Sequence, residues 1–266
     1  MGNTSRPFCG LCLGAGSTTL YPSGGTHGNP KQVYLEIMIR IGTVLTCVAL
    51  CTGQSYTINI LGLPAVNVEQ DMSTPGRIEF KTQNRGIFDM IWPARNVYSS
   101  HYDPETFGIT QWQKKIKQGE FKSNVSAKLD STGSLVYDNK KKINNEGATQ
   151  TIFTLLAMAQ FRDMEALDTQ WYDYEHEGQL GKARFVWSDS TPTWNGKDSI
   201  LCDHYRLDIE IKKEIGKFMM QTDYFMEGVV ADGIVRELWV SRKAPKKIIQ
   251  ASIKAMWFPV TAMINE

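Results

Sequence analysis

Hydrophobic and polar residues alternate along most of the chain that follows residue 56. In segment 121–129 the alternation is strict: Phe121, Val125 and Leu129 fall on one face, while Lys122 and Lys128 fall on the other. Strict alternation is typical of a strand that buries one face, as strands of an antiparallel sheet do. We expect 134–137 to pair back on this strand across a turn at 131–133. The same pattern predicts strands at 56–61, 77–81, 171–176, 183–187, 204–211, 234–240 and 248–263.

One segment has helical spacing instead. In 149–161, Ile152, Leu155, Leu156 and Ala159 recur at i, i+3, i+4 and i+7, which forms an apolar stripe along a helix. Thr149 and Thr151 are both placed to cap the start of this helix. We expect the stripe to lie on one face of the sheet. Segment 86–92 fits a second short helix or a turn onto a strand, because a short apolar run fits both periods.

These elements predict a mainly β protein. Its fold is expected to be a curved antiparallel sheet, an open or half barrel, with one or two packing helices. No linker composition and no internal repeat interrupts the chain after Tyr56, so 56–266 is expected to be a single β-rich domain.

The start of the chain has a different character. Segment 18–31 is rich in Gly, Pro, Ser and Thr, a composition typical of disorder. Arg40 is followed by the apolar run 41–50, which has the layout of a secretory signal peptide and is too short to span a bilayer. We interpret 1–37 as an over-extended start and 38–55 as a signal peptide, with an alternative in which 41–50 is a buried part of a longer fold. Export predicts a location in the periplasm or cell envelope, with no membrane span in the mature protein.

Cysteine spacing leaves one further alternative at the leader. Residues 48–51 are similar to a lipoprotein cleavage box, in which Cys51 is lipidated, although Leu50 is larger than the small residue expected there. Cys9 and Cys12 have redox or metal spacing, but no second pair follows them. They also lie in 1–37, which we interpret as an over-extended start.

The charge balance narrows the class of partner. Lys and Arg number 29 and Asp and Glu number 28, which leaves a formal charge of +1. A near-neutral chain lacks the basic character of a nucleic-acid-binding protein, and its overall composition lacks the bias of a membrane-surface helix. The partners that remain are a lipid or other apolar ligand, or another envelope protein.

No catalytic motif stands out. No histidine pair has helical metal-binding spacing, no nucleophile elbow is present, and no cofactor is predicted. His101, Asp103 and His204 are the candidates for an acid or base, and Glu175 and Glu177 are expected to share a strand face. These residues leave an enzyme as an alternative, but the absence of a motif favours a non-catalytic role.

The aromatic residues and methionines are spread over the predicted strands, where they either fill a core or line a cavity. A curved sheet covered by a helix can leave such a cavity. The residues proposed to line it are Trp112, Phe121, Phe153, Leu156, Trp187, Tyr205 and Trp257.

From Tyr56 onward the chain resembles the exported bacterial family labelled domain of unknown function 3108. The similar stretches are 56–64, 96–103 with Ser100 and Asp103, 149–162, and 235–247 followed by 248–264. This resemblance implies a signal peptide, a mainly β fold and a half barrel like that of lipoprotein carriers and outer-membrane lipoprotein receptors. It implies no established activity.

Three functions are compatible with these observations. The first is non-catalytic binding of a lipid or acyl chain inside the curved sheet. The second is an envelope hydrolase of glycan or lipid that uses Asp103, His101 or His204. The third is a structural or assembly factor that docks another envelope protein through an edge strand in 248–263.

Overall fold

The computed structural model describes residues 53–138, 141–144, 147–212, 223–254 and 259–265. The expected leader therefore lies outside the described residues, apart from 53–55, of which Gln54 and Ser55 belong to the first strand. Trp257 also lies outside them.

The described part of the chain forms one sheet of fifteen strands, and every pairing in it is antiparallel except that of β9 with β10. The order across the sheet is β8-β7-β6-β5-β4-β3-β2-β1-β15-β14-β13-β12-β11-β10-β9. This confirms the mainly β, open-sheet fold. In chain order the strands are β1 (Gln54–Ile60), β2 (Leu63–Asp71), β3 (Arg77–Asn84), β4 (Ala94–Tyr102), β5 (Ile109–Gln118), β6 (Phe121–Leu129), β7 (Ser134–Tyr137), β8 (Lys142–Asn144), β9 (Thr149–Gln150), β10 (Trp171–His176), β11 (Gln179–Trp194), β12 (Ser199–Ile211), β13 (Val235–Ser241), β14 (Ile248–Lys254) and β15 (Pro259–Ile264).

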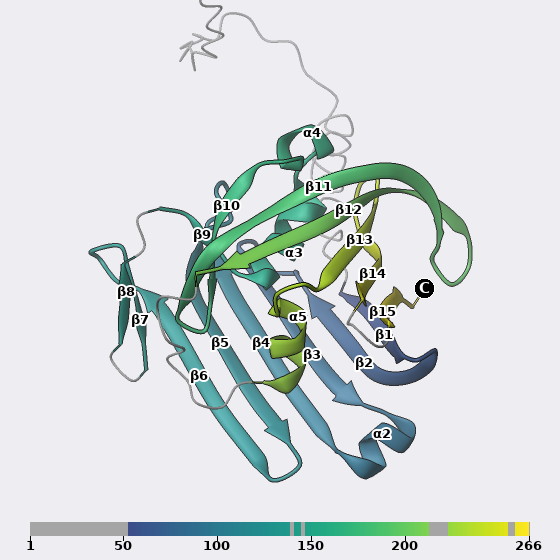
Figure 1. The fold of residues 1–266 in the computed structure, drawn as a ribbon, viewed down its shortest axis with the longest axis horizontal. Helices are drawn as coiled ribbons and strands as arrows, with labels where there is room; N and C mark the ends of the chain where they lie inside the picture. The colour runs from purple at the N-terminus through teal and green to yellow at the C-terminus, as the bar shows by residue number, and fades with distance from the viewer. Residues whose placement is uncertain (1–52, 139–140, 145–146, 213–222, 255–258, 266) are drawn as a thin grey trace, which may run out of the picture. The chain divides into compact units, whose positions relative to one another are not determined.

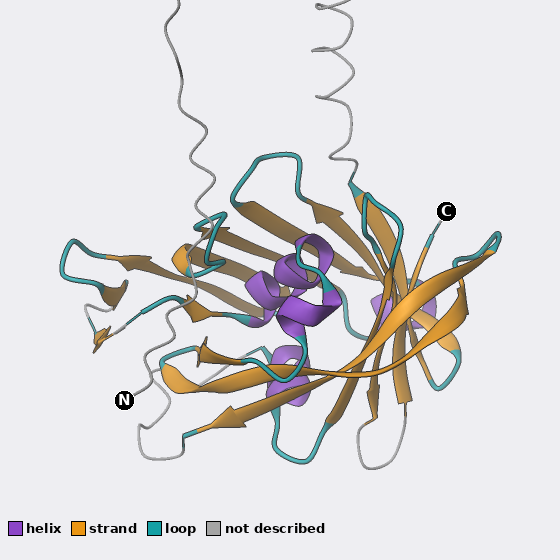
Figure 2. Cartoon of the chain, turned by 90° about the horizontal axis from the view of Figure 1, so that it is seen from above, coloured by secondary structure: helices purple, strands orange, loops and turns teal. Residues whose placement is uncertain are grey.

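The sheet curves around a central group of helices (Figure 2). The long strands β11 and β12 arch over one side of this group, and β2–β6 lie on its other side (Figure 1). The first strand pairs with the last, Ile58 opposite Ala262, so the two ends of the described chain meet in the middle of the sheet. The helices are α2 (Gly86–Ile91), α3 (Ile152–Phe161), α4 (Met164–Leu167) and α5 (Tyr224–Val230).

Helix α3 forms where its spacing predicts. Thr151 caps it: the Thr151 hydroxyl accepts from the backbone N–H of Thr154, and the Thr154 hydroxyl accepts from the backbone N–H of Thr151. The expected one-sided stripe is wrong, however. Ala157, Met158 and Gln160 are buried as well as Leu155, because strands face this helix from more than one side. A helix that is apolar nearly all round is typical of such enclosure.

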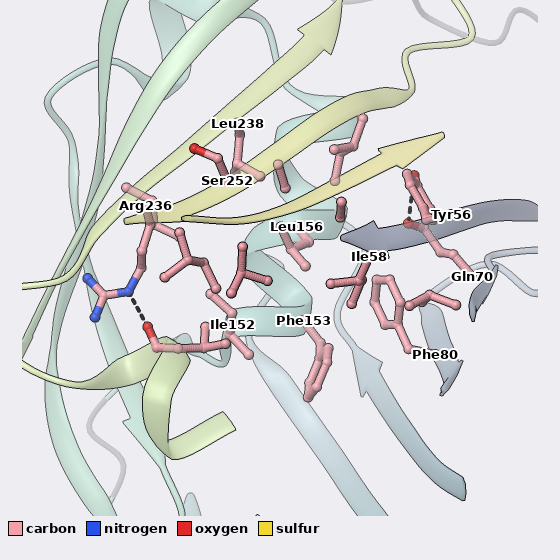
Figure 3. A pocket seen from close by; sticks show the side chains of 18 of the residues that line it. Tyr56, Ile58, Gln70, Phe80, Ile152, Phe153, Leu156, Arg236, Leu238 and Ser252 are labelled. Carbon is pink, nitrogen blue, oxygen red and sulfur yellow. Dashed lines mark hydrogen bonds between the residues drawn. The ribbon is translucent and has the colours of Figure 1, made fainter. Parts of the chain in front are cut away.

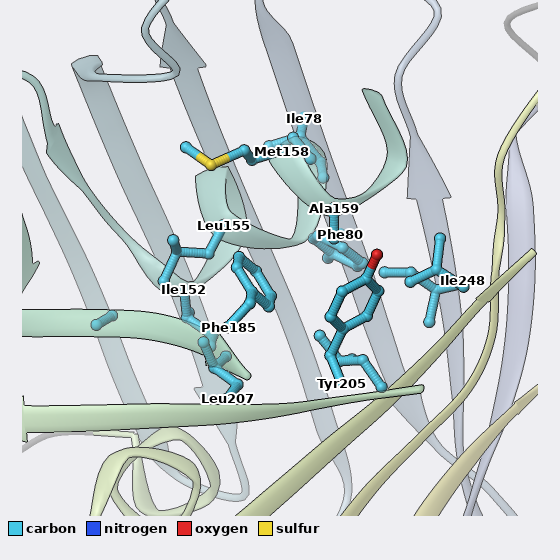
Figure 4. Close-up of a cluster of buried hydrophobic side chains, with 14 of the residues drawn as sticks. Ile78, Phe80, Ile152, Leu155, Met158, Ala159, Phe185, Tyr205, Leu207 and Ile248 are labelled. Carbon is cyan, nitrogen blue, oxygen red and sulfur yellow. The ribbon is translucent and has the colours of Figure 1, made fainter. Parts of the chain in front are cut away.

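The main hydrophobic core surrounds α3. Leu155 and Met158 of the helix pack with Phe80 of β3, Phe185 of β11 and Leu207 of β12 (Figure 4). A smaller cluster joins strands β5–β8, and Leu180 of β11 packs against it. Its buried members are Ile109, Trp112, Val125, Ala127, Leu135, Tyr137 and Ile143.

Two expectations about elements need correction. Segment 248–263 is not one strand but two, β14 and β15, whose pairing places Ala251 opposite Ala262. Both strands lie inside the sheet, between β1 and β13, so the expected edge strand in this segment is wrong. Strands β2, β4, β5, β8 and β9 were not expected from the pattern. In β5 the inward positions include Lys114 and Gln118, so polar residues occupy the buried face and hide the alternation.

Among the helices of the described residues, none has the length and apolar character needed to cross a bilayer.

Candidate ligand-binding cavity

The floor of an apolar cavity is a row of side chains that crosses four neighbouring strands. Leu238 of β13 lies opposite Ala251 of β14, Ala251 opposite Ala262 of β15, and Ala262 opposite Ile58 of β1. All four residues line the cavity. Since the two alanines in the middle of the row are small, they leave unfilled space between the sheet and the helix above it.

The roof of the cavity comes from two helices. Helix α3 contributes Ile152, Phe153 and Leu156, and α5 contributes Met226 and Val229 (Figure 3). The cavity between roof and floor has a volume of about 170 Å³. The remaining lining is mainly apolar and includes Val68, Phe80, Leu207, Ile248, Ile253 and Val260.

One end of the cavity is closed by uncharged polar groups. The Tyr56 hydroxyl donates to Gln54 Oε1 at 2.5 Å, and Gln70 Nε2 donates to Gln160 Oε1 at 3.1 Å. Gln160 Nε2 in turn donates to the Leu156 carbonyl at 3.0 Å. Burial raises the pKa of the Tyr56 hydroxyl well above its usual range, so it stays neutral. This end therefore offers hydrogen bonds without charge.

The other end carries a buried arginine that holds α5. The Arg236 guanidinium donates to the carbonyls of Val229, Ile234 (3.0 Å) and Ala231 (2.7 Å), which follow or end the helix. A cation suits the C-terminal end of a helix. Burial lowers the pKa of Arg236 from its usual value. This residue therefore ties the helix to β13.

The start of α5 is held by hydrogen bonds to β4 and β5. The buried Asp223 carboxylate accepts from the Tyr98 hydroxyl of β4 and from Gln118 Nε2 of β5, the latter at 2.9 Å. Burial, together with the charge of Asp223, raises the pKa of the Tyr98 hydroxyl. Helix α5 thus spans from β4 and β5 to β13 across the cavity.

A second, polar cluster lies beside the cavity, where the turn between β10 and β11 meets β5 and β7. Lys114 forms a buried ion pair with Glu177, and the Tyr137 hydroxyl donates to Glu175 Oε1, which also accepts from the Gly178 N–H at 2.6 Å. Burial raises the pKa of the Glu175 carboxyl to about 7, against the lowering effect of these bonds. The cluster thus connects β5 and β7 to the turn between β10 and β11 through an ion pair and hydrogen bonds.

This cluster borders a hollow of about 30 Å³, which is large enough for a water molecule. Ser100 Oγ and Glu175 Oε2 line it and have no hydrogen-bond partner within the described chain. Among the described residues, no three metal-ligating side chains gather into a cation site.

The structure brings some of the sequence-predicted lining residues together and places others elsewhere. Phe153 and Leu156 line the cavity. Trp112 lines the small polar hollow, and Tyr205 is buried in the main core. Phe121 packs against that core, as does Trp187, whose indole N–H donates to Asp203 at 3.3 Å.

The alanines of the floor were not expected from the sequence, and neither was the anchoring of α5. The only signal in the sequence was Ala251 and Ala262 in strands otherwise rich in larger apolar residues.

The three residues proposed for a hydrolase do not converge. Asp103 caps a turn, where its carboxylate accepts from the backbone N–H groups of Glu105 and Thr106. His101 is exposed on β4. His204 lies on β12, seven strands away across the sheet, stacked on Trp239 with ring centroids 4.3 Å apart. The geometry therefore assigns them no common site.

Comparison with known proteins finds a likeness of fold alone. No family model and no curated protein matches the chain. Its structure is similar to the crystal structure of a β-barrel-like protein of domain of unknown function DUF1849 from Brucella abortus, with a TM-score of 0.50 and 9% identity. The match covers 82% of this chain and 97% of that one. It does not point to the family of unknown function 3108 specifically, and what it shows is that this chain has a β-barrel-like fold.

Proposed function

We propose that this protein is a non-catalytic binding protein that holds a single acyl chain, or a similar slim apolar group, in the cavity under α3 and α5. The observation that carries the proposal is the unfilled apolar space above Ala251 and Ala262, beside the main hydrophobic core. Apolar cavities of this kind bind apolar molecules without any catalytic group. The proposal keeps the location in the cell envelope that the leader pattern predicts.

The size of the cavity limits the ligand. Drug-sized ligands occupy pockets of roughly 300–1,000 Å³, whereas a dry cavity of about 150 Å³ holds one benzene molecule. A volume of about 170 Å³ therefore suits a chain segment of roughly six carbons. A second hollow of about 210 Å³ shares Ile58 and Thr82 with the cavity, so a longer chain has a direction in which to continue.

Burial of apolar surface supplies the affinity. Each buried methylene contributes about 0.8 kcal/mol, so six contribute about 5 kcal/mol. That value corresponds to a dissociation constant of roughly a few hundred micromolar before the cost of ordering the ligand. Tighter binding requires the chain to reach the second hollow or its polar end to bond the amides of Gln70 and Gln160.

Filling the cavity tests this proposal. We expect Ala251→Phe to abolish binding of cis-parinaric acid, a linear fluorescent fatty acid, because the new ring occupies the space above the sheet. Thermal stability should be retained, because the ring adds packing in an existing void. The measurement is a fluorescence titration of the full chain, with decanoic acid as competitor.

Ala166→Phe is the matched control, since Ala166 is exposed on α4 and lines no part of the cavity. It should bind the probe as the wild type does. The proposed function is wrong if Ala251→Phe binds the probe as tightly as the wild type and Ala166→Phe do. It is also wrong if the wild type binds neither the probe nor decanoic acid.

A further inference from the structure

Large apolar side chains gather at one exposed end of the sheet. They belong to α2 with the residue after it, to the β1–β2 turn and to the first residue of β2, and we call them the α2 rim. Met90 and Ile91 are the most exposed, at 78% and 75%. The members of the rim are Leu61, Leu63, Ile87, Met90, Ile91 and Trp92.

The two segments of the rim are neighbours. The Arg85 N–H, at the start of α2, donates to the Ala65 carbonyl of β2 at 2.9 Å. Asn84 Nδ2 donates to the Trp92 carbonyl at 2.7 Å, which holds the end of α2 against the end of β3. Helix α2 lies in the connection between β3 and β4, at the ends of these strands (Figure 1). Leu63 therefore lies close to the helix.

Helix α2 has no buried residue. Its residues Ile87, Met90 and Ile91 are spaced at i, i+3 and i+4, so they form one apolar face of the helix. Within the described residues nothing buries this face. Contiguous exposed apolar surface of this kind marks an interaction site.

Basic residues lie next to the rim. On the outer face of β4, β5 and β6, Arg95 is opposite Lys117, and Lys117 is opposite Lys122. These three and Lys115 are exposed. The carboxylates nearby are Asp89, which pairs with Arg95, and Glu120 in the β5–β6 turn. The near-neutral total charge of the chain thus conceals a local excess of cations.

The rim also borders the space that leads to the ligand cavity. Trp92 and Asn84 line the hollow of about 210 Å³, together with Ile58 and Thr82. Ile58 and Thr82 line the ligand cavity as well. One member of the rim, Trp92, therefore lines a hollow that shares two lining residues with the ligand cavity.

We propose that the α2 rim docks on the surface of an anionic lipid bilayer, with its apolar side chains in the headgroup and acyl boundary and the adjacent lysines over the headgroups. Apolar residues flanked by lysine and arginine, with a tryptophan between them, are the composition that binds such interfaces. A contact between two copies through this face would bring two basic faces together, which disfavours it. Docking on the bilayer does not require a ligand in the cavity. The inference rests on the proposed function in one respect only, that the docked face is where an acyl chain would enter the cavity.

Vesicle co-sedimentation of the full chain tests the docking. The wild type should bind vesicles of phosphatidylcholine and phosphatidylglycerol at 3:1, and bind pure phosphatidylcholine at least tenfold more weakly. The triple variant Ile87→Ser, Met90→Ser, Ile91→Ser should lose at least tenfold in binding to the anionic vesicles. Trp194→Ser with Leu201→Ser, which changes exposed apolar residues at the β11–β12 hairpin, should bind as the wild type does.

Charge is tested in the same way. Lys115→Glu, Lys117→Glu, Lys122→Glu should abolish the preference for anionic vesicles. The matched control is the triple variant Lys197→Glu, Lys212→Glu, Lys243→Glu, which changes exposed lysines away from the rim. It should bind the anionic vesicles more tightly than the variant at Lys115, Lys117 and Lys122 does.

Quenching locates the contact. An acyl-brominated lipid should quench the tryptophan fluorescence of the wild type, and quench Trp92→Phe less than Trp194→Phe. Residues 1–52 contain no tryptophan, so this signal arises from the chain that follows them.

Equal vesicle binding by the wild type and the Ile87, Met90, Ile91 triple variant would overturn docking through the rim. So would a wild type that ignores anionic vesicles and instead forms a dimer that the triple variant loses in sedimentation velocity. Binding of cis-parinaric acid is measured without vesicles, so failure of the docking and failure of the proposed function are separate results.

Discussion

Glu175 is a carboxylic acid whose surroundings oppose its ionisation. It is 1% exposed, and the groups that act on it are Tyr137 of β7, Trp112 of β5, the Gly178 N–H and the neighbouring Glu177. Desolvation raises its pKa to about 7 from an ordinary 4.5. The folded protein therefore binds a proton at Glu175 between these two values, where the unfolded chain has released it.

The sign of the pH effect follows. The contribution of Glu175 to the free energy of unfolding is most favourable below about pH 4.5, where the carboxyl is protonated in both the folded and the unfolded chain. It falls as the pH rises from about 4.5 to about 7. Above about pH 7 the protein is less stable by about 3 kcal/mol because of this group. Glu175→Gln keeps an acceptor for Tyr137 and Gly178 but cannot ionise. We expect its free energy of unfolding, relative to the wild type, to rise by about 3 kcal/mol between pH 4.5 and pH 8.

Urea denaturation at each pH measures this difference, with the exposed Glu120→Gln as control, which should follow the wild type. A constant difference between Glu175→Gln and wild type across the window would contradict the ionisation assigned to Glu175.

The lining of the cavity could be predicted from the sequence only where residues lie on the helix. Of the residues proposed from the sequence, Phe153 and Leu156 line it, and both lie in the segment whose spacing predicts a helix. The aromatic residues Trp112, Tyr205 and Trp187 were expected at the cavity for their size, but large side chains fill space rather than leave it. The decisive residues, Ala251 and Ala262, are small, and only the pairing of β14 with β15 puts them side by side.

Helix α5 is the element that closes the cavity, and it is held at both ends by groups on different strands. Asp223 accepts from Tyr98 and Gln118 at its start, and Arg236 binds the carbonyls at its end. Its apolar contribution to the core comes from Met226 and Val230. A helix of this length depends on such tertiary contacts.

We expect Tyr98→Phe to loosen α5, because it removes a donor to a buried carboxylate and leaves the ring that packs against Phe153 at 5.1 Å. Hydrogen bonds to charged groups contribute about 1.5–3 kcal/mol, so stability should fall by about 2 kcal/mol. Release of cis-parinaric acid, followed by stopped-flow fluorescence, should become faster.

Tyr172→Phe is the control, since the Tyr172 hydroxyl bonds an exposed backbone carbonyl, that of Ala166, at 3.2 Å. It should cost less than about 1 kcal/mol. If both variants lose the same stability and release the probe at the wild-type rate, the Tyr98 contact does not hold α5.

At the level of elements, alternation predicts strands well where one face is apolar and the other polar. It gives β6, β7 and β10 with the bounds that the structure shows. It fails for β4 and β5, because Asn96, Ser100 and Lys114 occupy buried positions on the inner face. Lys114 belongs to the buried polar cluster, and Gln118 of the same strand anchors α5, so the failure at β5 falls where the sheet carries more than core packing.

At the scale of the whole molecule, the order of the strands could not be predicted from the sequence. Fold class follows from local pattern, but β1 pairs with β15 across about two hundred residues, and such pairing leaves no local signal. The likeness to a β-barrel-like protein at 9% identity supports the same fold without naming a ligand. The space between sheet and helix arises from this long-range arrangement.

The central claim is that an apolar chain occupies the space bounded by Ala251, Ala262 and Leu156. The most direct measurement is a crystal structure of the full chain with 10-bromodecanoic acid, in which anomalous scattering locates the bromine. We predict a bromine peak inside the cavity under α3 and α5, or in the adjoining hollow lined by Trp92. A bromine found only on the outer surface, with the cavity filled by protein side chains, would contradict the account.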